Sequence, residues 1–501
     1  MDQNITPNTD THLSAFAPYS LSDPYDLSVT EIDASMSANL SATYNFDYNN
    51  AAQVVVSTIL GEIPAVGVLL SALTDIFWPS SEVDVWEQIQ KRVEALMNQK
   101  IADRVQQQVQ EALAGLQNVL DDYIDAVKNF KDQPTYISEK FNVAQGHFLH
   151  DLPQFQSKSY EILLLPLFAQ FANMHLGLLR DGASFGQQWG WSHQVTEHIK
   201  QQLSKYIKDY SQYVDTIYAK GLEQTKSGAS SNKAKTEPFN TINRYVREMT
   251  LTVLDFQFMW QYFDLARYPT PSRVYPDREI YSDAVGTSHN SSFGLPSQAP
   301  TQAISDLTVW GWDRIDAIQA DYPPNGGPDG HSTTGRMGNT HGGANTPPHG
   351  GVFNTESKPV TLVRTQTGDI LNAMWLQFKD GTWSYKLGGN YPGGYSQDFS
   401  YAGEILSSIK IMGASYFYGS ADCAVFGFKF ERSPEISAEI LQLLYRCSVE
   451  HVPPAQLARR LGASEQTVRD ASIWAEQNHW VLVRERRWSQ LMARVSSRQK
   501  D

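Results

Sequence analysis

Residues of the types that bind metals or catalyse reactions are present, but their spacing favours neither chemistry. His331, His341 and His349 lie ten and eight residues apart in a Gly-rich stretch, which is a poor arrangement for a metal ion. Cys423 and Cys447 are the two cysteines, too few for a disulfide framework or a thiolate metal site. The sequence contains no Gly-x-Ser-x-Gly, His-Glu-x-x-His or phosphate-loop motif. We therefore expect no enzymatic activity, no metal site and no cofactor.

The segment with the most unusual chemistry runs from Ile162 to Leu179, 18 residues without a formal charge. Its polar members are Gln170, Asn173 and His175. A helix of this length reaches roughly 30 Å, the thickness of the hydrocarbon core of a bilayer. A helix that is apolar all round is either the centre of a helical bundle or a membrane span, and periodicity alone favours the buried helix.

Amphipathic helices are predicted on both sides of this segment. Apolar residues recur every three to five positions over residues 84–130, which is typical of long helices with one apolar face. Residues 51–78 also have a helical composition, with a break near Pro64. Further helices are expected over residues 137–149 (stopped by Pro153), 192–219 and 240–265. Together these segments predict a bundle of seven helices around a central helix over residues 160–179.

Helical periodicity stops near residue 268, and short alternating runs separated by glycine-containing turns follow. The runs predicted as strands are 307–312, 360–364, 373–378, 383–387, 405–412 and 424–430. They are typical of an antiparallel β domain, and their pattern suits a β-prism of three sheets. The Gly-, Pro- and His-rich stretch over residues 323–351 is expected to form a long exposed loop.

The chain of 501 residues is accordingly predicted to be a multidomain α+β protein. The predicted parts are a flexible leader over 1–48, a helical bundle over 49–268, an antiparallel β-prism-like domain over 269–431 and a small winged-helix-like tail over 432–501. The leader lacks a basic segment followed by an apolar one, so we expect no signal peptide and synthesis in the cytoplasm. The formal net charge of −14 disfavours nucleic-acid binding by the chain as a whole.

Four blocks of sequence, in order and at matching spacing, resemble the three-domain δ-endotoxins, the pore-forming crystal (Cry) proteins. The motif VEALMNQKIAD resembles the second and third helices of their pore domain, and PQF, YEI, AQFANMHL and LLRD resemble the block around their central helix. Residues 245–269 resemble the last helix, and REIY, beginning at Arg278, the first strand of the middle domain. One departure is Pro166, because the family carries its proline nearer Tyr160. Pro166 is expected to bend the central helix.

The resemblance implies that the central helix and the helix before it enter a target-cell membrane as a hairpin, within a homo-oligomeric pore. The candidate residues for insertion and pore lining are Asn142, Gln145, Tyr160, Ala169, Gln170, Asn173 and His175. It also implies trimming of the leader by a gut protease near residues 40–50 and action at the host gut membrane. The usual third domain of the family, a β-sandwich, is not evident in the sequence.

Aromatic residues in the loops of the predicted β domain are candidate contacts to a surface glycoprotein or glycolipid. Aromatic rings stack on sugar faces and anchor protein interfaces. These candidates are Tyr391, Tyr395, Tyr416, Phe417 and Tyr418. The loop ending in Asp422 resembles the sugar-binding loop of jacalin-type lectins, in which the aspartate accepts sugar hydroxyls. An ordinary hairpin turn explains the same four residues equally simply.

Two other functions stay open beside the pore-forming insecticidal toxin. A lectin-like carbohydrate-binding protein without pore activity would use the β domain and leave the helical half unexplained. A DNA-binding protein would use the helix–turn–helix of the tail, with Gln466, Thr467 and Arg469 at the start of its second helix. The tail holds 11 Lys or Arg against 8 Asp or Glu residues, whereas the chain as a whole is acidic. Nucleic acid is therefore not the expected partner.

Overall fold

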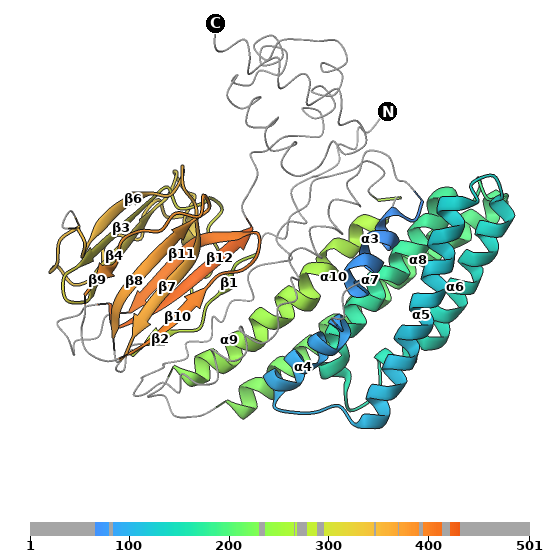
Figure 1. Cartoon of the computed structure of the whole chain (residues 1–501), viewed down its shortest axis with the longest axis horizontal. Coiled ribbons are helices and arrows are strands. Elements are labelled where there is room, and N and C mark those ends of the chain that lie inside the picture. The colour runs from blue at the N-terminus through green and yellow to red at the C-terminus, as the bar shows by residue number, and fades with distance from the viewer. Residues whose placement is uncertain are drawn as a thin grey trace, which may run out of the picture.

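The computed structural model describes two halves of the chain, one helical and one built from β-sheets (Figure 1). The described residues are 66–79, 84–229, 236–264, 266–267, 278–287, 295–344, 347–368, 370–389, 394–412 and 421–430. The predicted leader over 1–48 and the predicted tail over 432–501, with Gln466, Thr467 and Arg469, lie outside these residues.

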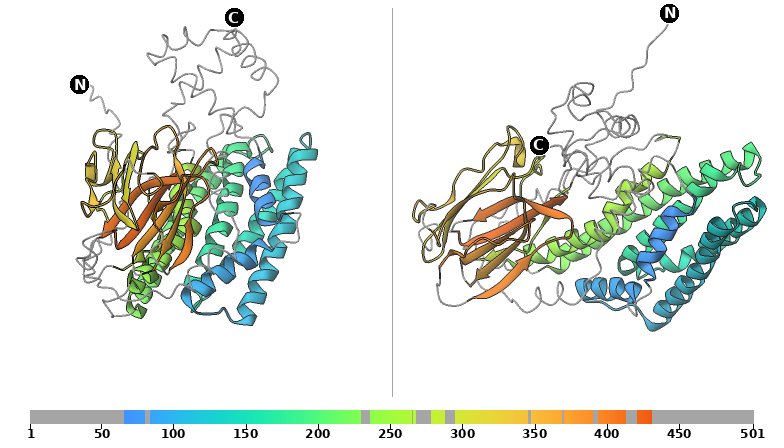
Figure 2. Two further views of the ribbon diagram at one scale, coloured as in Figure 1. Left: turned by 60° about the vertical axis from the view of Figure 1, so that its left-hand side comes forward. Right: turned by 45° about the horizontal axis from the view of Figure 1, so that its top comes forward.

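The helical half is a bundle of long rods around one central helix, α7, as the sequence predicts (Figures 1 and 2). Its elements are α3 (Val68–Phe77), α4 (Val85–Met97), α5 (Asp103–Asn129), α6 (Pro134–Phe155), α7 (Glu161–Phe185), α8 (His193–Gly228) and α9 (Glu237–Met249). The last rod continues through the π-helical turn η2 (Thr250–Leu254) into α10 (Asp255–Trp260) and the 3-10 turn η3 (Gln261–Phe263). The outer helices are amphipathic. On α5, Val109, Leu113 and Leu116 are buried at helical spacing.

Two helices run further than the sequence suggests. Pro153 was expected to stop α6, yet the helix continues to Phe155. A proline in the last turn removes only its own N–H bond, and Phe155 packs its ring 4.5 Å from that of Phe171. Helix α8 extends past residue 219 to Gly228, because Gly221 leaves room for Tyr245 of α9 to pack against it. Residues 220–228, beyond the predicted end at residue 219, are therefore helical.

The β half contains, among the described residues, three antiparallel four-stranded sheets around a common apolar core. Sheet A consists of β1 (Ile280–Tyr281), β2 (Val285–Gly286), β11 (Glu404–Met412) and β12 (Cys423–Phe430). Sheet B, in the order β5-β4-β3-β6, consists of β5 (Met337–Gly338), β4 (Ile315–Asp321), β3 (Asp306–Gly311) and β6 (Gly351–Asn354). Sheet C, in the order β10-β7-β8-β9, consists of β10 (Tyr395–Phe399), β7 (Val360–Thr367), β8 (Leu371–Phe378) and β9 (Leu387–Gly388). The predicted three-sheet β-prism architecture is confirmed.

Three details of the β half differ from the sequence prediction. The stretch over residues 323–351 is not all loop, because Met337 and Gly338 form β5 on the free edge of β4. The predicted strand over 383–387 shrinks to β9, preceded by a single bridge between Trp383 and Gln377. Strands β4 and β10 were not predicted, since their sequences mix polar and apolar residues too evenly to stand out.

Buried ion pairs join the two halves where α9 and α10 lie beside sheet A (Figure 2). Arg278, just before β1, pairs with Asp255 of α10 and Glu404 of β11, each at 2.6 Å. Asp283 pairs with Arg244 at 2.7 Å and with Arg247 at 2.9 Å, both on α9. Since buried charges are costly unless they are paired, these contacts fix how α9 and α10 meet the sheet.

Candidate functional site: the buried central helix

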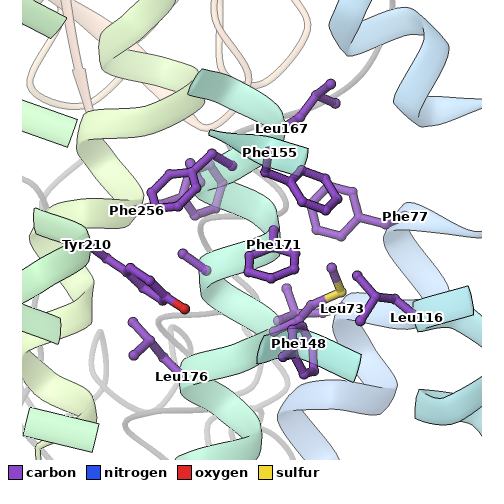
Figure 3. Packing of buried hydrophobic residues seen from close by; sticks show 14 of the residues in the cluster. Leu73, Phe77, Leu116, Phe148, Phe155, Leu167, Phe171, Leu176, Tyr210 and Phe256 are labelled. Atoms are coloured by element: carbon purple, nitrogen blue, oxygen red, sulfur yellow. The ribbon is translucent and has the colours of Figure 1, made fainter. Parts of the chain in front are cut away.

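Helix α7 is enclosed on all sides. Every residue from Ile162 to Ala183 is buried, and the helix runs through Pro166 without interruption. Figure 3 shows Phe171 and Leu176 of α7 among side chains from α3, α5, α6 and α8. Of the helices in the described part of the chain, α7 is the one long and apolar enough to cross a bilayer, a property that core helices of soluble proteins also have. Its length and burial are therefore compatible with both environments.

A first hydrogen-bonded set satisfies the amides in the middle of α7. Gln170 donates from Nε2 to the carbonyl of Thr252, which lies in the π-helical turn, at 3.1 Å. Asn173 donates from Nδ2 to Oε1 of Gln170 at 2.8 Å and accepts from Nε1 of Trp260 at 2.7 Å. Because these groups are fully buried, each bond offsets a desolvation cost. The set ties α7 to the last rod of the bundle.

A second set surrounds His175, which is fully buried. Its Nδ1 lies 2.6 Å from the hydroxyl of Tyr210 on α8, and its Nε2 lies 3.1 Å from Oε1 of Gln145 on α6. The amide oxygen of Gln145 only accepts, so the neutral ring donates from Nε2 and accepts from Tyr210 at Nδ1. The imidazole also stacks on Phe148, with ring centres 4.9 Å apart. Burial lowers the pKa of His175 to about 3, so the ring stays neutral.

A third set lies at the end of the apolar run. Asp181 accepts from the backbone N–H of Gly67, at the start of α3, at 2.8 Å and from the hydroxyl of Tyr123 on α5 at 3.0 Å. Burial raises the pKa of Asp181 to about 7, while the two hydrogen bonds and neighbouring Arg180 oppose that rise. One carboxyl group thus connects α3, α5 and α7.

The helical half also matches a known family. Residues 54–264 match the family described as delta endotoxin, N-terminal domain. The helical half of the chain is therefore similar to the N-terminal domain of the δ-endotoxins. The Cry-type resemblance drawn from the sequence blocks is thereby confirmed.

Curated relatives of this chain are pesticidal crystal proteins of Bacillus thuringiensis. The chain is 31% identical over 273 residues to Cry26Aa of subspecies finitimus, covering 52% of this chain and 23% of the relative. It is 33% identical over 251 residues to Cry19Aa of subspecies jegathesan, covering 46% of this chain and 37% of the relative. The chain therefore spans well under half the length of these relatives.

Solved structures show the same fold. The chain resembles the insecticidal δ-endotoxin Cry8Ea1 of Bacillus thuringiensis with a TM-score of 0.62 and 21% identity, over 77% of this chain and 75% of that one. It resembles the mosquito-larvicidal Cry4Aa toxin of the same species with a TM-score of 0.62 and 18% identity, over 78% and 74%. These matches cover both the helical and the β half, so the predicted fold class is confirmed.

Helix α6 carries a stretch without formal charge, and one side of this stretch faces outward. Between Lys140 and Asp151 it has no formal charge. Asn142 is exposed, whereas Gln145 is half-buried in its contact with His175. Gly146 and His147 are also exposed, while Phe148 points inward to α7. The helix thus has an apolar side toward α7 and an uncharged outer side, on which exposed Val143 and Leu149 accompany the polar residues.

The remaining residues proposed from the sequence occupy mixed positions. Tyr160 directly precedes α7 and is half-buried, and Ala169 is fully buried. Tyr395 lies half-buried on β10. Tyr391, Tyr416, Phe417 and Tyr418 lie outside the described residues. Asp422 is fully buried beside β12, so the expectation of an exposed sugar-binding aspartate is wrong for this fold.

Sequence reasoning missed the role of Asp181 and of the junction arginine Arg278. Both lie within stretches that were recognised by resemblance, but neither was assigned a function. The signal that could have revealed Asp181 is the pair of adjacent charges, Arg180 and Asp181, at the end of an apolar run. A charge at that position needs a buried partner. Among the described residues no cluster of His, Cys, Asp or Glu suits a metal ion, and His349 instead lies 2.9 Å from the carbonyl of Gly388.

Proposed function

We propose that this protein is an insecticidal pore-forming toxin that acts on gut epithelial membranes. In this proposal a gut protease trims the leader, the β domain binds a receptor, oligomers assemble and the α6–α7 hairpin inserts. The observation that carries the proposal is helix α7, in which residues 162–179 carry no formal charge and are long enough to cross a bilayer. Amphipathic helices of the region that matches the δ-endotoxin N-terminal domain enclose it. Made in the cytoplasm and released, the toxin would act at the host gut.

Helix α7 can move from the interior of the bundle into lipid without exposing its apolar side chains to water. In water the surrounding helices cover its apolar side chains, and in lipid the acyl chains replace those helices. Its backbone hydrogen bonds remain internal in both states. Insertion breaks hydrogen bonds in the buried sets around Gln170, His175 and Asp181, and this costs free energy. These side chains lose their partners on α5, α8 and the last rod. Those sets hold the bundle closed until binding energy at the membrane exceeds that cost.

Helix α6 supplies the water-facing side of the hairpin. Its bond between Gln145 and His175 is internal to the α6–α7 pair and can persist during insertion. The exposed residues of α6 from Asn142 to Leu149 carry no formal charge, so this stretch can face an aqueous pore without placing an ion in the membrane. The polar line of α6 is thus the proposed pore lining.

Dye release from liposomes, with and without trypsin pretreatment and from neutral to alkaline pH, tests the proposal. Wild-type protein is expected to release dye. Ala169→Asp, which places a charge in the middle of α7, is expected to abolish release, with circular dichroism checking that the bundle still folds. Absence of release by folded wild-type protein under every condition would contradict the proposal and leave the lectin-like alternative.

A second variant tests pore lining without touching the core. Asn142 is exposed in the bundle, so Asn142→Lys should leave the melting temperature unchanged. In planar bilayers it is expected to shift ion selectivity toward anions, because a positive ring repels cations. Asn142→Gln, an uncharged change at the same exposed position, is the matched control and should leave ion selectivity unchanged. Unchanged selectivity in Asn142→Lys would contradict the assigned orientation of α6.

A further inference from the structure

The outer face of sheet C carries an ordered row of charged and aromatic side chains. Arg364 of β7 lies between Trp375 of β8 and Asp398 of β10 as direct cross-strand neighbours, so all three project from one face. The guanidinium donates to both carboxylate oxygens of Asp398 at 2.7 Å. This two-pronged bond holds the arginine in place although both side chains are more than 40% exposed.

Two tryptophans on this face each carry a cation. The guanidinium carbon of Arg364 lies 4.9 Å from the ring centre of Trp383, and Nζ of Lys386 lies 5.4 Å from the ring centre of Trp375. Trp383 is 40% exposed. Gln366 shares the face, two residues along β7 from Arg364. The result is a flat surface, the sheet C platform (Arg364, Trp375, Trp383, Lys386 and Asp398), in which aromatic planes alternate with hydrogen-bonding groups.

The composition of the platform selects among possible occupants. A lipid surface requires a contiguous apolar area, and here each ring is flanked by a charged group. An acidic chain would meet the carboxylate of Asp398, which already neutralises Arg364. A neutral sugar suits both the aromatic rings and the polar groups of the platform. Its C–H face stacks on indole rings, and its hydroxyl groups form hydrogen bonds with carboxylate, amide and guanidinium groups.

We propose that the sheet C platform binds a neutral oligosaccharide, with successive sugar rings against Trp383 and Trp375. None of the platform residues is among the aromatic loop residues predicted from the sequence. The inference rests on the proposed function, because it names neutral oligosaccharides as the class of ligand in the receptor-binding step.

Calorimetric titration of the full chain with cellotetraose, mannotetraose and the tetramer of N-acetylglucosamine tests the inference. At least one neutral tetrasaccharide is expected to bind, and Trp383→Ala is expected to weaken it about tenfold or more. Trp383→Phe keeps an aromatic plane and should retain most of the affinity, which separates loss of stacking from loss of folding. Val352→Ala is the matched control, because Val352 is 55% exposed on sheet B and offers no ring.

Several results would overturn the inference. They are no binding of any neutral tetrasaccharide, equal binding by Trp383→Ala and wild type, or preferential binding of a sulfated heparin tetrasaccharide. Dye release from sugar-free liposomes separates this inference from the pore. Trp383→Ala should release dye there as wild type does, and a selective loss of release would assign Trp383 to lipid contact instead.

Discussion

The helical half and the β half use tryptophan in opposite ways. Trp260 of the bundle is fully buried and donates to Asn173 of the central helix. Trp383 and Trp312 of the β half are 40% and 58% exposed. An exposed indole gives up the stabilisation that burial would provide, so its retention on a surface points to binding rather than folding. The bundle encloses a hydrophobic helix, whereas the β domain exposes these two tryptophan rings to solvent.

The largest expected effect lies where the two halves meet. Arg278→Met would leave the buried carboxylates of Asp255 and Glu404 without a cation and is expected to cost about 3–5 kcal/mol of unfolding free energy. Arg364→Met removes an arginine that also pairs with a carboxylate, but at the surface, and is expected to cost about 0–1 kcal/mol. Urea denaturation of both variants measures the difference. Equal losses would refute the distinction between a buried junction and an exposed platform.

The pH dependence of the bundle is expected to come from two buried groups with opposite signs. The folded-state pKa of Asp181 is raised to about 7 from 3.8, so its contribution to stability falls as pH rises through that window. The folded-state pKa of His175 is lowered to about 3 from 6.5, so its contribution is present above pH 6.5 and is lost as pH falls. Between pH 3.8 and 6.5 the two slopes oppose each other.

Substitution of one of these two groups should reveal the pH dependence of stability that comes from the other. Relative to wild type, Asp181→Asn is expected to make stability rise with pH in this window by up to about 1.4 kcal/mol per pH unit, and His175→Gln should have the opposite effect. Urea midpoints at pH 4.5, 5.5 and 6.5 for both variants and wild type give the slopes. Parallel profiles for all three proteins would show that neither group titrates with a shifted pKa.

The last comparison pairs a buried tryptophan substitution with an exposed one. Trp260→Phe loses a buried hydrogen bond and leaves Oδ1 of Asn173 unsatisfied, at a cost of about 1–3 kcal/mol. Trp383→Phe, at an exposed position, should stay within about 0.5 kcal/mol of wild type. Thermal melts followed by circular dichroism measure both. A larger loss for Trp383→Phe than for Trp260→Phe would mean that the β-domain ring is structural.

Prediction from sequence succeeded where a pattern repeats over many residues. The charge-free run of α7 and the apolar stripe of α5 each have a periodicity that one chain segment specifies by itself. Strand β4 was missed because its burial depends on neighbours on both sides, and Pro153 was misjudged because Phe155 contributes packing beyond it. The aromatic loop candidates were chosen by residue type alone, and Asp422 proved to be buried.

The sequence by itself determined that a long apolar helix exists here, that amphipathic helices must cover it in water, and that a β domain follows. It determined this because the free energy of hydrophobic burial is proportional to the apolar area removed from water. The spacing of apolar residues along each segment shows which face will be buried. Only the tertiary structure decided which distant groups meet. Asp181 reaches Gly67, 114 residues away, and Arg364 joins Asp398 across two strands, because hydrogen bonds and ion pairs depend on geometry that residue spacing does not encode.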